Sequence, residues 1–233
     1  MAEQARALDV LFREFGGRPG DEVLDVACGI GTQALGLAAR GYAVTASDLS
    51  VGAITRARRE ALRRGLDIEL SVADMRRAHE HHASGFDVVL CADNALPHLL
   101  NDADILEALR QFRACLRPGG ACVISVRDYA SVERGGTQVK PYGLRRDGTA
   151  RCVAFQVWEW REPFYDLSLY LVRDALGANC KTEVFRSTYY AITIPELMNL
   201  MVRAGFEHVE RRDDVLFQPV LVGIRTAVEQ GVP

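Results

Sequence analysis

The chain has 233 residues, 48% of them hydrophobic, which is enough for one large α/β domain with a full core. Its 28 basic and 31 acidic side chains give a net charge of −3 and leave no basic tail, so nucleic acid is not an expected partner. No apolar run approaches the roughly 20 residues of a membrane span and no signal peptide begins the chain, so we expect a cytoplasmic protein with no membrane partner.

The first half of the chain alternates helical patterns with short apolar runs. An amphipathic helix is expected over residues 2–16. Strands are then expected at 23–27, 42–47, 68–73, 86–91 and 121–127, and helices at 31–40, 50–64 and 102–116. Arg-Pro-Gly-Gly at 117–120 is expected to end the last of these helices. This alternation predicts a parallel sheet with helices on both faces.

The pattern changes after Arg127. A loop over 131–148 is expected to lead into three strands rich in aromatic and β-branched residues, at 151–160, 167–173 and 182–190. Their alternation is typical of antiparallel strands, so we interpret residues 129–190 as an inserted, substrate-covering cap. A helix at 194–204 and strands at 206–211 and 216–224 complete the chain. The predicted fold is a single α/β domain over 1–233, a Rossmann-like, seven-stranded, mostly parallel sheet with an antiparallel cap after the fifth strand.

The most informative stretch is the glycine turn that follows the first strand. Gly29 and Gly31 let the backbone approach a ligand that a β-carbon would push away. The helix that follows leaves backbone N–H groups at its start, suited to a polar or anionic group. Gly29, Gly31 and Ala34 also fit the dinucleotide fingerprint, so the motif by itself leaves NAD open.

Three acids at the ends of consecutive strands favour a different ligand. Asp48 follows the second strand, where a carboxylate can accept both hydroxyls of a ribose. Asp25 ends the first strand and can face a cationic amino group, whereas it would repel a pyrophosphate. Asp74 follows the third strand and can accept from an adenine amino group. Together they suit S-adenosylmethionine, which has an amino acid at one end and adenosine at the other.

Cysteine and histidine usage gives no sign of a metal site. The six cysteines form no C-x-x-C pair and fit free thiols in a reducing compartment. His79, His81 and His82 lie in a polar connection without the (i, i+4) spacing of a helical metal site. We therefore expect a solvated loop there and no metal.

With these features in place, the chain resembles the class I S-adenosylmethionine-dependent methyltransferases, and most of all the glycine and sarcosine N-methyltransferase group. The resemblance covers roughly residues 4–225. It is carried by 23–29, 86–99, 117–120, 127–129 and 185–190. Ala27, which departs from the general methyltransferase glycine pattern, is what this group has at that position.

The resemblance implies roles for particular residues. The residues implied in binding the cofactor are Asp25, Ala27, Cys28, Gly29, Gly31, Asp48, Leu49, Asp74, Met75 and Ala92. Asn94 and His98 are implied to face the methyl acceptor and are the catalytic candidates. The substrate-binding candidates are Asn94, His98, Arg127, Lys140, Tyr189 and Tyr190.

Three departures from the group bear on the acceptor. The sequence starts inside the first helix of the family pattern, so it does not include the family's N-terminal extension. The residue that holds the glycine carboxylate has no clear match, with Lys140 near its place and Arg145 or Arg146 as substitutes. Asp74 and Met75 stand where the group has Asn-Trp.

The sequence therefore predicts transfer of a methyl group from S-adenosylmethionine to the nitrogen of a small molecule, an amino acid or a small amine. Three alternatives stay open: an O-methyltransferase or amino-sugar N-methyltransferase, a protein that binds S-adenosylmethionine without turnover, and an NAD enzyme, which Asp25 and Asp74 disfavour. The expected partner is a small molecule, and self-association is left open.

Overall fold

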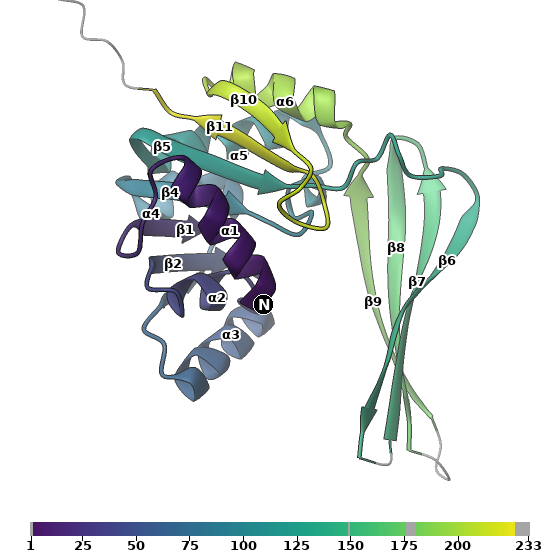
Figure 1. Cartoon of the computed structure of the whole chain (residues 1–233). Coiled ribbons are helices and arrows are strands. Elements are labelled where there is room, and N and C mark those ends of the chain that lie inside the picture. The colour runs from purple at the N-terminus through teal and green to yellow at the C-terminus, as the bar shows by residue number, and fades with distance from the viewer. Residues whose placement is uncertain (1, 149, 176–179, 227–233) are drawn as a thin grey trace, which may run out of the picture. The chain divides into compact units, whose positions relative to one another are not determined.

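The computed structural model describes residues 2–148, 150–175 and 180–226, which form two compact units (Figure 1). The first unit contains the chain up to Leu96, Asp102–Asp128 and the chain from Thr193 onward. The second contains Pro97–Asn101 and Tyr129–Ile192, so it coincides closely with the predicted insert.

The first unit is built on a seven-stranded sheet with the order β10-β11-β5-β4-β1-β2-β3. The five central and edge strands from β5 to β3 run parallel, while β11 pairs antiparallel with β5 and β10 antiparallel with β11. This confirms the predicted mostly parallel sheet. The strands are β1 Glu22–Asp25, β2 Ala43–Asp48, β3 Glu69–Val72, β4 Phe86–Cys91, β5 Leu116–Ser125, β10 Glu207–Arg212 and β11 Val220–Ile224.

Alternate residues of these strands are buried on opposite faces of the sheet. Val23 and Val88 belong to one apolar cluster with side chains of α1 (Ala2–Glu14), α2 (Ala34–Ala38) and α3 (Val51–Arg64). Leu24 and Val89 are also fully buried but lie outside that cluster. Strands buried on both faces read as continuous apolar runs, which is why these segments were recognisable in the sequence.

Three further helices complete this unit: α4 (Ala78–His82), α5 (Asp102–Cys115) and α6 (Ile194–Arg203). A short 3₁₀ turn, η1 (Met75–Arg77), precedes α4, and a second, η2 (Leu96–His98), follows β4. α6 begins with a capping box between Thr193 and Glu196, which satisfies two backbone N–H groups that the helix itself leaves without partners.

Three local expectations were wrong in this unit. The histidine tract at 79–82 is not a loop but part of α4, because His81 and His82 each contact a strand serine, Ser71 and Ser47, at 3.0 Å. The run at 117–120 does not precede the fifth strand but lies within β5, where the pairing with β4 shifts register. The expected helix at 31–40 is shorter, since only Ala34–Ala38 is α-helical.

The second unit is a four-stranded antiparallel sheet in the order β6-β7-β8-β9. Its strands are β6 Thr137–Asp147, β7 Ala150–Arg161, β8 Phe164–Asp174 and β9 Lys181–Tyr190. The last three are the predicted antiparallel strands. β6 was expected to be loop, and it is a strand because ten of its residues pair with β7 around a bulge between Pro141 and Gly143. No helix among the described residues is long and apolar enough to cross a membrane.

Candidate functional site

The parallel pairing brings the ends of four strands to one edge of the first unit's sheet. Asp25 pairs with Ala46 of β2, two residues before Asp48, and its other neighbour is Leu90 of β4. Asp48 in turn pairs with Val72, two residues before Asp74. Ligands of open α/β sheets bind outside the carboxyl ends of such strands, so this edge is the candidate site.

Asp25 is the most unusual group at this edge. Its side chain is fully buried, and its Oδ1 accepts a hydrogen bond from the Ala27 backbone N–H at 3.3 Å. Its Oδ2 is also buried and has no hydrogen-bond partner. Desolvation, together with the charges of Asp48 and Asp93, raises the pKa of the Asp25 carboxyl to about 7. A buried carboxylate oxygen without a hydrogen-bond partner reduces the stability of the fold. A cationic or hydrogen-bond-donating group bound at this edge would therefore be favoured.

The glycine turn adopts the conformation for which glycine is suited. Gly29 and Gly31 have φ values of 54° and 87°, in the left-handed region. A β-carbon built on Gly29 would meet no atom within 4 Å, so its side of the turn is open to a ligand. A β-carbon on Gly31 would lie 3.0 Å from the Leu35 side chain, so this glycine is needed for packing instead.

Asp48 holds the glycine turn from the neighbouring strand. Its Oδ2 accepts from the Gly29 backbone N–H at 2.9 Å, and its Oδ1 accepts from the Ser50 backbone N–H at 2.8 Å. Each carboxylate oxygen has two lone pairs, so Asp48 keeps acceptor capacity for a ligand hydroxyl. Leu49, which follows it, is 71% exposed and presents an apolar surface beside the turn.

Asp74 has a local structural role that the sequence did not predict. It begins the η1 turn, where its Oδ1 accepts from the Arg76 backbone N–H at 2.9 Å, and it forms an ion pair with the Arg76 guanidinium at 2.6 Å. These bonds to Arg76 hold the pKa of the Asp74 carboxyl below its ordinary value. Met75 is half-buried beside it.

The loop after β4 contains two consecutive strained residues. Asp93 and Asn94 have φ values of 55° and 62°, a conformation that costs a non-glycine residue about 1–2 kcal/mol. Ser125, at the end of β5, holds both: its hydroxyl accepts from the Asp93 N–H at 2.8 Å and its carbonyl accepts from the Asn94 N–H at 3.0 Å. The Asn94 Oδ1 accepts from the Arg127 N–H at 2.9 Å, so two predicted residues are brought together.

Sequence reasoning missed two residues of this arrangement. Gln33 is buried, and its amide donates to the Asp93 carboxylate at 2.8 Å. Ser125 is buried as well and fixes Asp93 and Asn94 as described above. Neither carries a motif signal, since their importance comes from the left-handed backbone at 93 and 94, which a sequence does not reveal.

The remaining predicted residues lie in the second unit. His98 Nδ1 is 3.0 Å from the Ser187 hydroxyl, and the His98 ring lies against Tyr189 with centroids 4.2 Å apart. Tyr189 stacks on the buried Tyr165 at 5.1 Å. Lys140 places its Nζ over the Trp158 ring, 4.7 Å from the centroid, a favourable cation–π distance. Tyr190 instead packs against Phe164, on the other face of the sheet.

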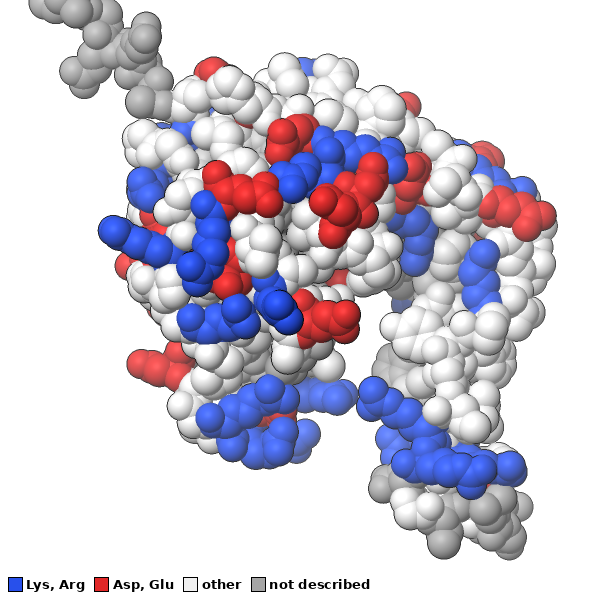
Figure 2. Space-filling view, viewed as in Figure 1, with Lys and Arg blue, Asp and Glu red and all other residues white. Residues whose placement is uncertain are grey.

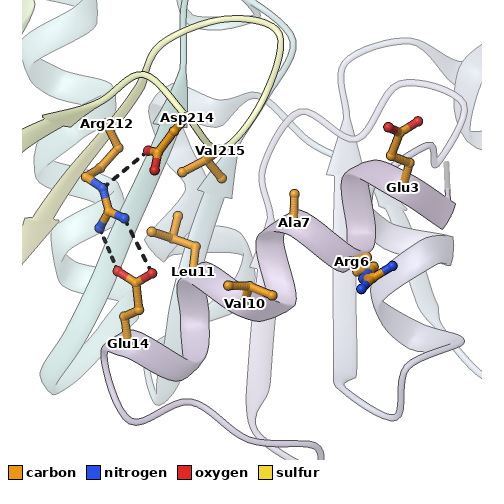
Figure 3. Close-up of a pocket in the computed structure, with 9 residues that line it drawn as sticks. All are labelled: Glu3, Arg6, Ala7, Val10, Leu11, Glu14, Arg212, Asp214 and Val215. Atoms are coloured by element: carbon orange, nitrogen blue, oxygen red, sulfur yellow. Dashed lines mark hydrogen bonds and ion pairs between the residues drawn. The ribbon is translucent and has the colours of Figure 1, made fainter.

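A pocket of about 270 Å³ lies elsewhere in the first unit, between α1 and the connection from β10 to β11 (Figure 3). An ion pair between Arg212 and Glu14, at 2.6 Å, spans one end of it (Figure 3). None of its nine lining residues is a predicted site residue. Among the residues that the structure describes, no group of His, Cys, Asp or Glu side chains is arranged to hold a metal ion.

Comparison with known proteins identifies the kind of domain to which this edge belongs. A family model described as a methyltransferase domain matches residues 23–120. The glycine/sarcosine N-methyltransferase of Parasynechococcus marenigrum is 33% identical over 130 residues, which are 56% of this chain and 45% of that protein. The ubiquinone biosynthesis O-methyltransferase of Azoarcus sp. is 35% identical over 109 residues, 47% of this chain and 45% of that protein.

Residues 23–120 are therefore a methyltransferase domain, and the chain shares its fold with S-adenosylmethionine-dependent methyltransferases of known structure. Its fold is shared along nearly the whole length with the amino pentose methyltransferase from Micromonospora echinaspora involved in calicheamicin biosynthesis, a structure solved with S-adenosylmethionine bound. The two are 21% identical with a TM-score of 0.81, over 97% of this chain and 91% of the other.

Within the chain, the residues that match the family model do not coincide with either of the two units. The family model covers β1 to the start of β5, and therefore the glycine turn and all three strand-end acids. The inserted strands β6–β9 lie outside it. The chain spans about half the length of the curated relatives it matches. The match to the family model therefore includes the sheet edge with the glycine turn and the strand-end acids, and it does not identify the methyl acceptor.

Proposed function

We propose that this methyltransferase transfers a methyl group from S-adenosylmethionine to the nitrogen of a small molecule. The observation that carries the proposal is the buried Asp25 carboxylate, whose Oδ2 lacks a partner at the sheet edge where this family's cofactor is used. The cofactor's amino group is a donor of the kind that this oxygen requires. The open side of Gly29 gives a ligand access to the backbone beside it.

The remaining acids suit the other end of the cofactor. Asp48 keeps acceptor capacity for the ribose hydroxyls, as argued above. Asp74 and Met75 are proposed to meet the adenine, with an acceptor for its amino group and an apolar side chain for its ring. Cys28 and Ala92 are both buried and follow the ends of β1 and β4 at the same edge, and we propose that their backbone borders the cofactor.

S-adenosylmethionine, when bound, supplies a methyl group on a sulfonium, a leaving group that needs no acid catalysis. The protein's contribution is then to hold a neutral nucleophile in line with that methyl group, and orientation of this kind can supply roughly 7–11 kcal/mol of the barrier. The fixed Asp93–Asn94 loop, held by Ser125 and Gln33, provides a rigid side-chain amide for that purpose. We assign the orienting role to the Asn94 side chain.

Two considerations favour a nitrogen acceptor. A neutral amine needs only the loss of one proton, whereas a hydroxyl acceptor needs a base to activate it. The Parasynechococcus relative, which matches over 130 residues, is named for glycine and sarcosine. Glycine itself is not assigned, because Lys140 lies over Trp158 and a lysine does not replace a bidentate arginine.

The rival function is O-methylation. The Azoarcus relative is an O-methyltransferase at similar identity, and His98 offers an imidazole, the side chain that most often serves as a general base. The contact of His98 with Ser187 and Tyr189 gives this ring a fixed environment, as a base would need. This alternative is separated from the first by the acceptors that the protein turns over.

A turnover assay with a labelled methyl donor tests the proposal. The panel contains glycine, sarcosine, unrelated primary amines, amino sugars and phenolic hydroxyls, with methylated products identified by mass spectrometry. We expect label on the nitrogen of at least one small amine. Label only on oxygen would establish the rival, and donor binding without any product would leave the protein a binder of S-adenosylmethionine.

The variant Asn94→Gly sharpens this assay, because glycine keeps the left-handed backbone and removes the side-chain amide, together with the bond that its Oδ1 accepts from the Arg127 N–H. We expect it to reduce kcat on the best amine by at least about tenfold, which corresponds to about 1.4 kcal/mol. Asn199→Ala, on the exposed surface of α6, is the matched control and should behave as the parent. Unchanged turnover in Asn94→Gly would remove Asn94 from the acceptor site.

A further inference from the structure

The pocket beside α1 has a lining that is separate from the proposed cofactor site. Six of its nine lining residues come from α1, at positions three or four apart that share one face of a helix. The other three are Arg212, at the end of β10, and Asp214 and Val215, in the connection to β11. The pocket, which we call the α1 pocket, is therefore a groove that follows the helix (Figure 3).

The middle of the α1 pocket is apolar. Figure 3 shows Ala7, Val10 and Leu11 between two groups of charged side chains, one at each end of the pocket. Leu11 is fully buried, whereas Val10 is 54% exposed although its side chain is apolar. A ligand with an apolar body would cover Val10 and remove its surface from water, which favours binding.

One end of the α1 pocket carries an excess of negative charge. Three carboxylates surround the single Arg212 guanidinium, those of Glu14 at 2.6 Å, Glu210 at 3.6 Å and Asp214 at 3.7 Å. The bonds from Arg212 hold the pKa of the Glu14 carboxyl below its ordinary value, so Glu14 is ionised at neutral pH. Asp214 is 79% exposed, and its contact with Arg212 is the longest of the three. A second cation is therefore favoured beside Asp214.

The other end of the α1 pocket carries Arg6. Its guanidinium forms no hydrogen bond and no ion pair with any residue that the structure describes. Glu3 lies one turn away, but Figure 3 shows the two side chains leaving the helix in different directions. A guanidinium presents its N–H donors in a planar fork that matches a carboxylate. This end therefore favours an anionic group. Figure 2 shows the same mixture of acidic and basic side chains on this part of the surface.

The distance between the two ends sets the length of a ligand that can reach both. From Arg6 to Glu14 the helix rises about 12 Å, at ~1.5 Å per residue. In 6-aminohexanoate, the extended chain from the nitrogen to the carboxyl carbon spans roughly 7 Å, at the same rise per bond as an extended backbone. A charge-assisted hydrogen bond of ~2.8 Å at each end brings the total to roughly 13 Å. A molecule of this length can therefore contact both ends at once.

We propose that the α1 pocket binds a small zwitterion in which an aliphatic chain separates an ammonium group from a carboxylate. The ammonium group lies beside Asp214, the chain covers Val10, and the carboxylate pairs with Arg6. An alkylamine or an alkyl carboxylate of the same length uses only one charged end, so each should bind more weakly than the zwitterion. The proposal is independent of the cofactor and of the methyl acceptor, because none of the lining residues belongs to the proposed methyl-transfer site.

Titration of the full chain with 6-aminohexanoate, hexylamine and hexanoate, followed by ligand-observed nuclear magnetic resonance, tests the proposal. We expect 6-aminohexanoate to bind saturably, and hexylamine and hexanoate each to bind at least about fivefold more weakly. Saturating S-adenosylhomocysteine should not displace 6-aminohexanoate, because the two occupy different sites. This result does not depend on which acceptor the protein methylates.

Two variants identify the end of the pocket at which each charged group binds. Asp214→Asn should weaken 6-aminohexanoate and hexylamine by at least about fivefold and should not weaken hexanoate. Arg6→Gln should weaken 6-aminohexanoate and hexanoate by a similar factor and should not weaken hexylamine. A variant that merely disturbed the fold would affect all three molecules alike, and circular dichroism checks that both variants are folded.

Each variant has a matched control outside the lining of the pocket. Asp213→Asn removes a carboxylate one residue away from Asp214, and Arg59→Gln removes an exposed guanidinium on α3. Both should bind 6-aminohexanoate as the parent does. The proposal would be overturned if the parent showed no saturable binding, or if Asp214→Asn and Arg6→Gln kept the parental affinity. Displacement of 6-aminohexanoate by S-adenosylhomocysteine would overturn it too, by moving the binding to the cofactor edge.

Discussion

At the scale of single residues, the buried Asp25 carboxyl is the group whose ionisation most affects the proposed cofactor site. Its carboxyl is fully buried and has a pKa of about 7 in the folded protein, against an ordinary value of 3.8. The folded state therefore holds a proton that the unfolded state loses between pH 4 and 7, so the free energy of unfolding of the cofactor-free protein falls as the pH rises through that range.

Asp25→Asn removes this titration. We expect the variant to exceed the parent in free energy of unfolding at pH 8 by roughly 2–4 kcal/mol, and the difference to shrink towards pH 4. Urea unfolding at several pH values measures it. Asp67→Asn changes an exposed acid two residues before β3, at the opposite edge of the sheet, and should show no such trend. A parent and an Asp25→Asn variant with parallel pH profiles would contradict the burial argument.

A second prediction concerns Ser125, whose hydroxyl accepts from the strained Asp93 N–H. Ser125→Ala leaves that N–H without its acceptor, which costs about 1–3 kcal/mol of stability and loosens the loop that holds Asn94. We expect both the midpoint temperature of thermal unfolding and kcat to be lower in this variant than in the parent. Thr55→Ala, which removes an exposed hydroxyl on α3, is the control. If Ser125→Ala turned over its acceptor as fast as the parent, the loop would not need this hydroxyl.

At the scale of the elements, His81 and His82 connect α4 to the sheet through their contacts with Ser71 and Ser47. Burial and the neighbouring His81 lower the pKa of His82 to about 4, and the His82 Nε2 lies 3.0 Å from the Ser47 hydroxyl on β2. An imidazole that is harder to protonate when folded favours the unfolded state in acid. Stability should therefore decrease as the pH falls from 6.5 to 4.

His82→Gln should abolish that part of the acid-induced loss, roughly 1–3 kcal/mol between pH 6.5 and 4. His79→Gln, at an exposed position of the same helix, should retain it. Chemical unfolding at pH 4.5 and 7 compares the two. Equal acid sensitivity of the parent and both variants would show that other groups cause the loss.

The elements that could be predicted from the sequence are those with an uninterrupted pattern of apolar residues. The parallel strands are buried on both faces, and their apolar runs, together with Asp25, Gly29 and Asp48 at their ends, indicated the sheet and its functional edge. β6 could not be predicted because Pro141, Gly143 and basic residues interrupt its pattern, and pairing with β7 decides its conformation. Likewise Gln33 and Ser125 matter only through the left-handed backbone that they hold.

At the scale of the whole molecule, the two units contain different groups of predicted site residues. The first carries the glycine turn and the strand-end acids, which the family model matches, and the second carries His98, Lys140 and the aromatic strands. The central claim concerns the first unit: its carboxyl edge binds S-adenosylmethionine. The acceptor can be revised without affecting that claim.

Isothermal calorimetry with S-adenosylmethionine and S-adenosylhomocysteine, on the parent and on Asp48→Ala, tests this claim most directly. We expect both ligands to bind the parent, Asp48→Ala to bind at least about tenfold more weakly since it loses the ribose acceptor, and Asp67→Ala at the opposite edge to match the parent. Parental affinity in Asp48→Ala, or tight binding of NAD by the parent, would contradict the account.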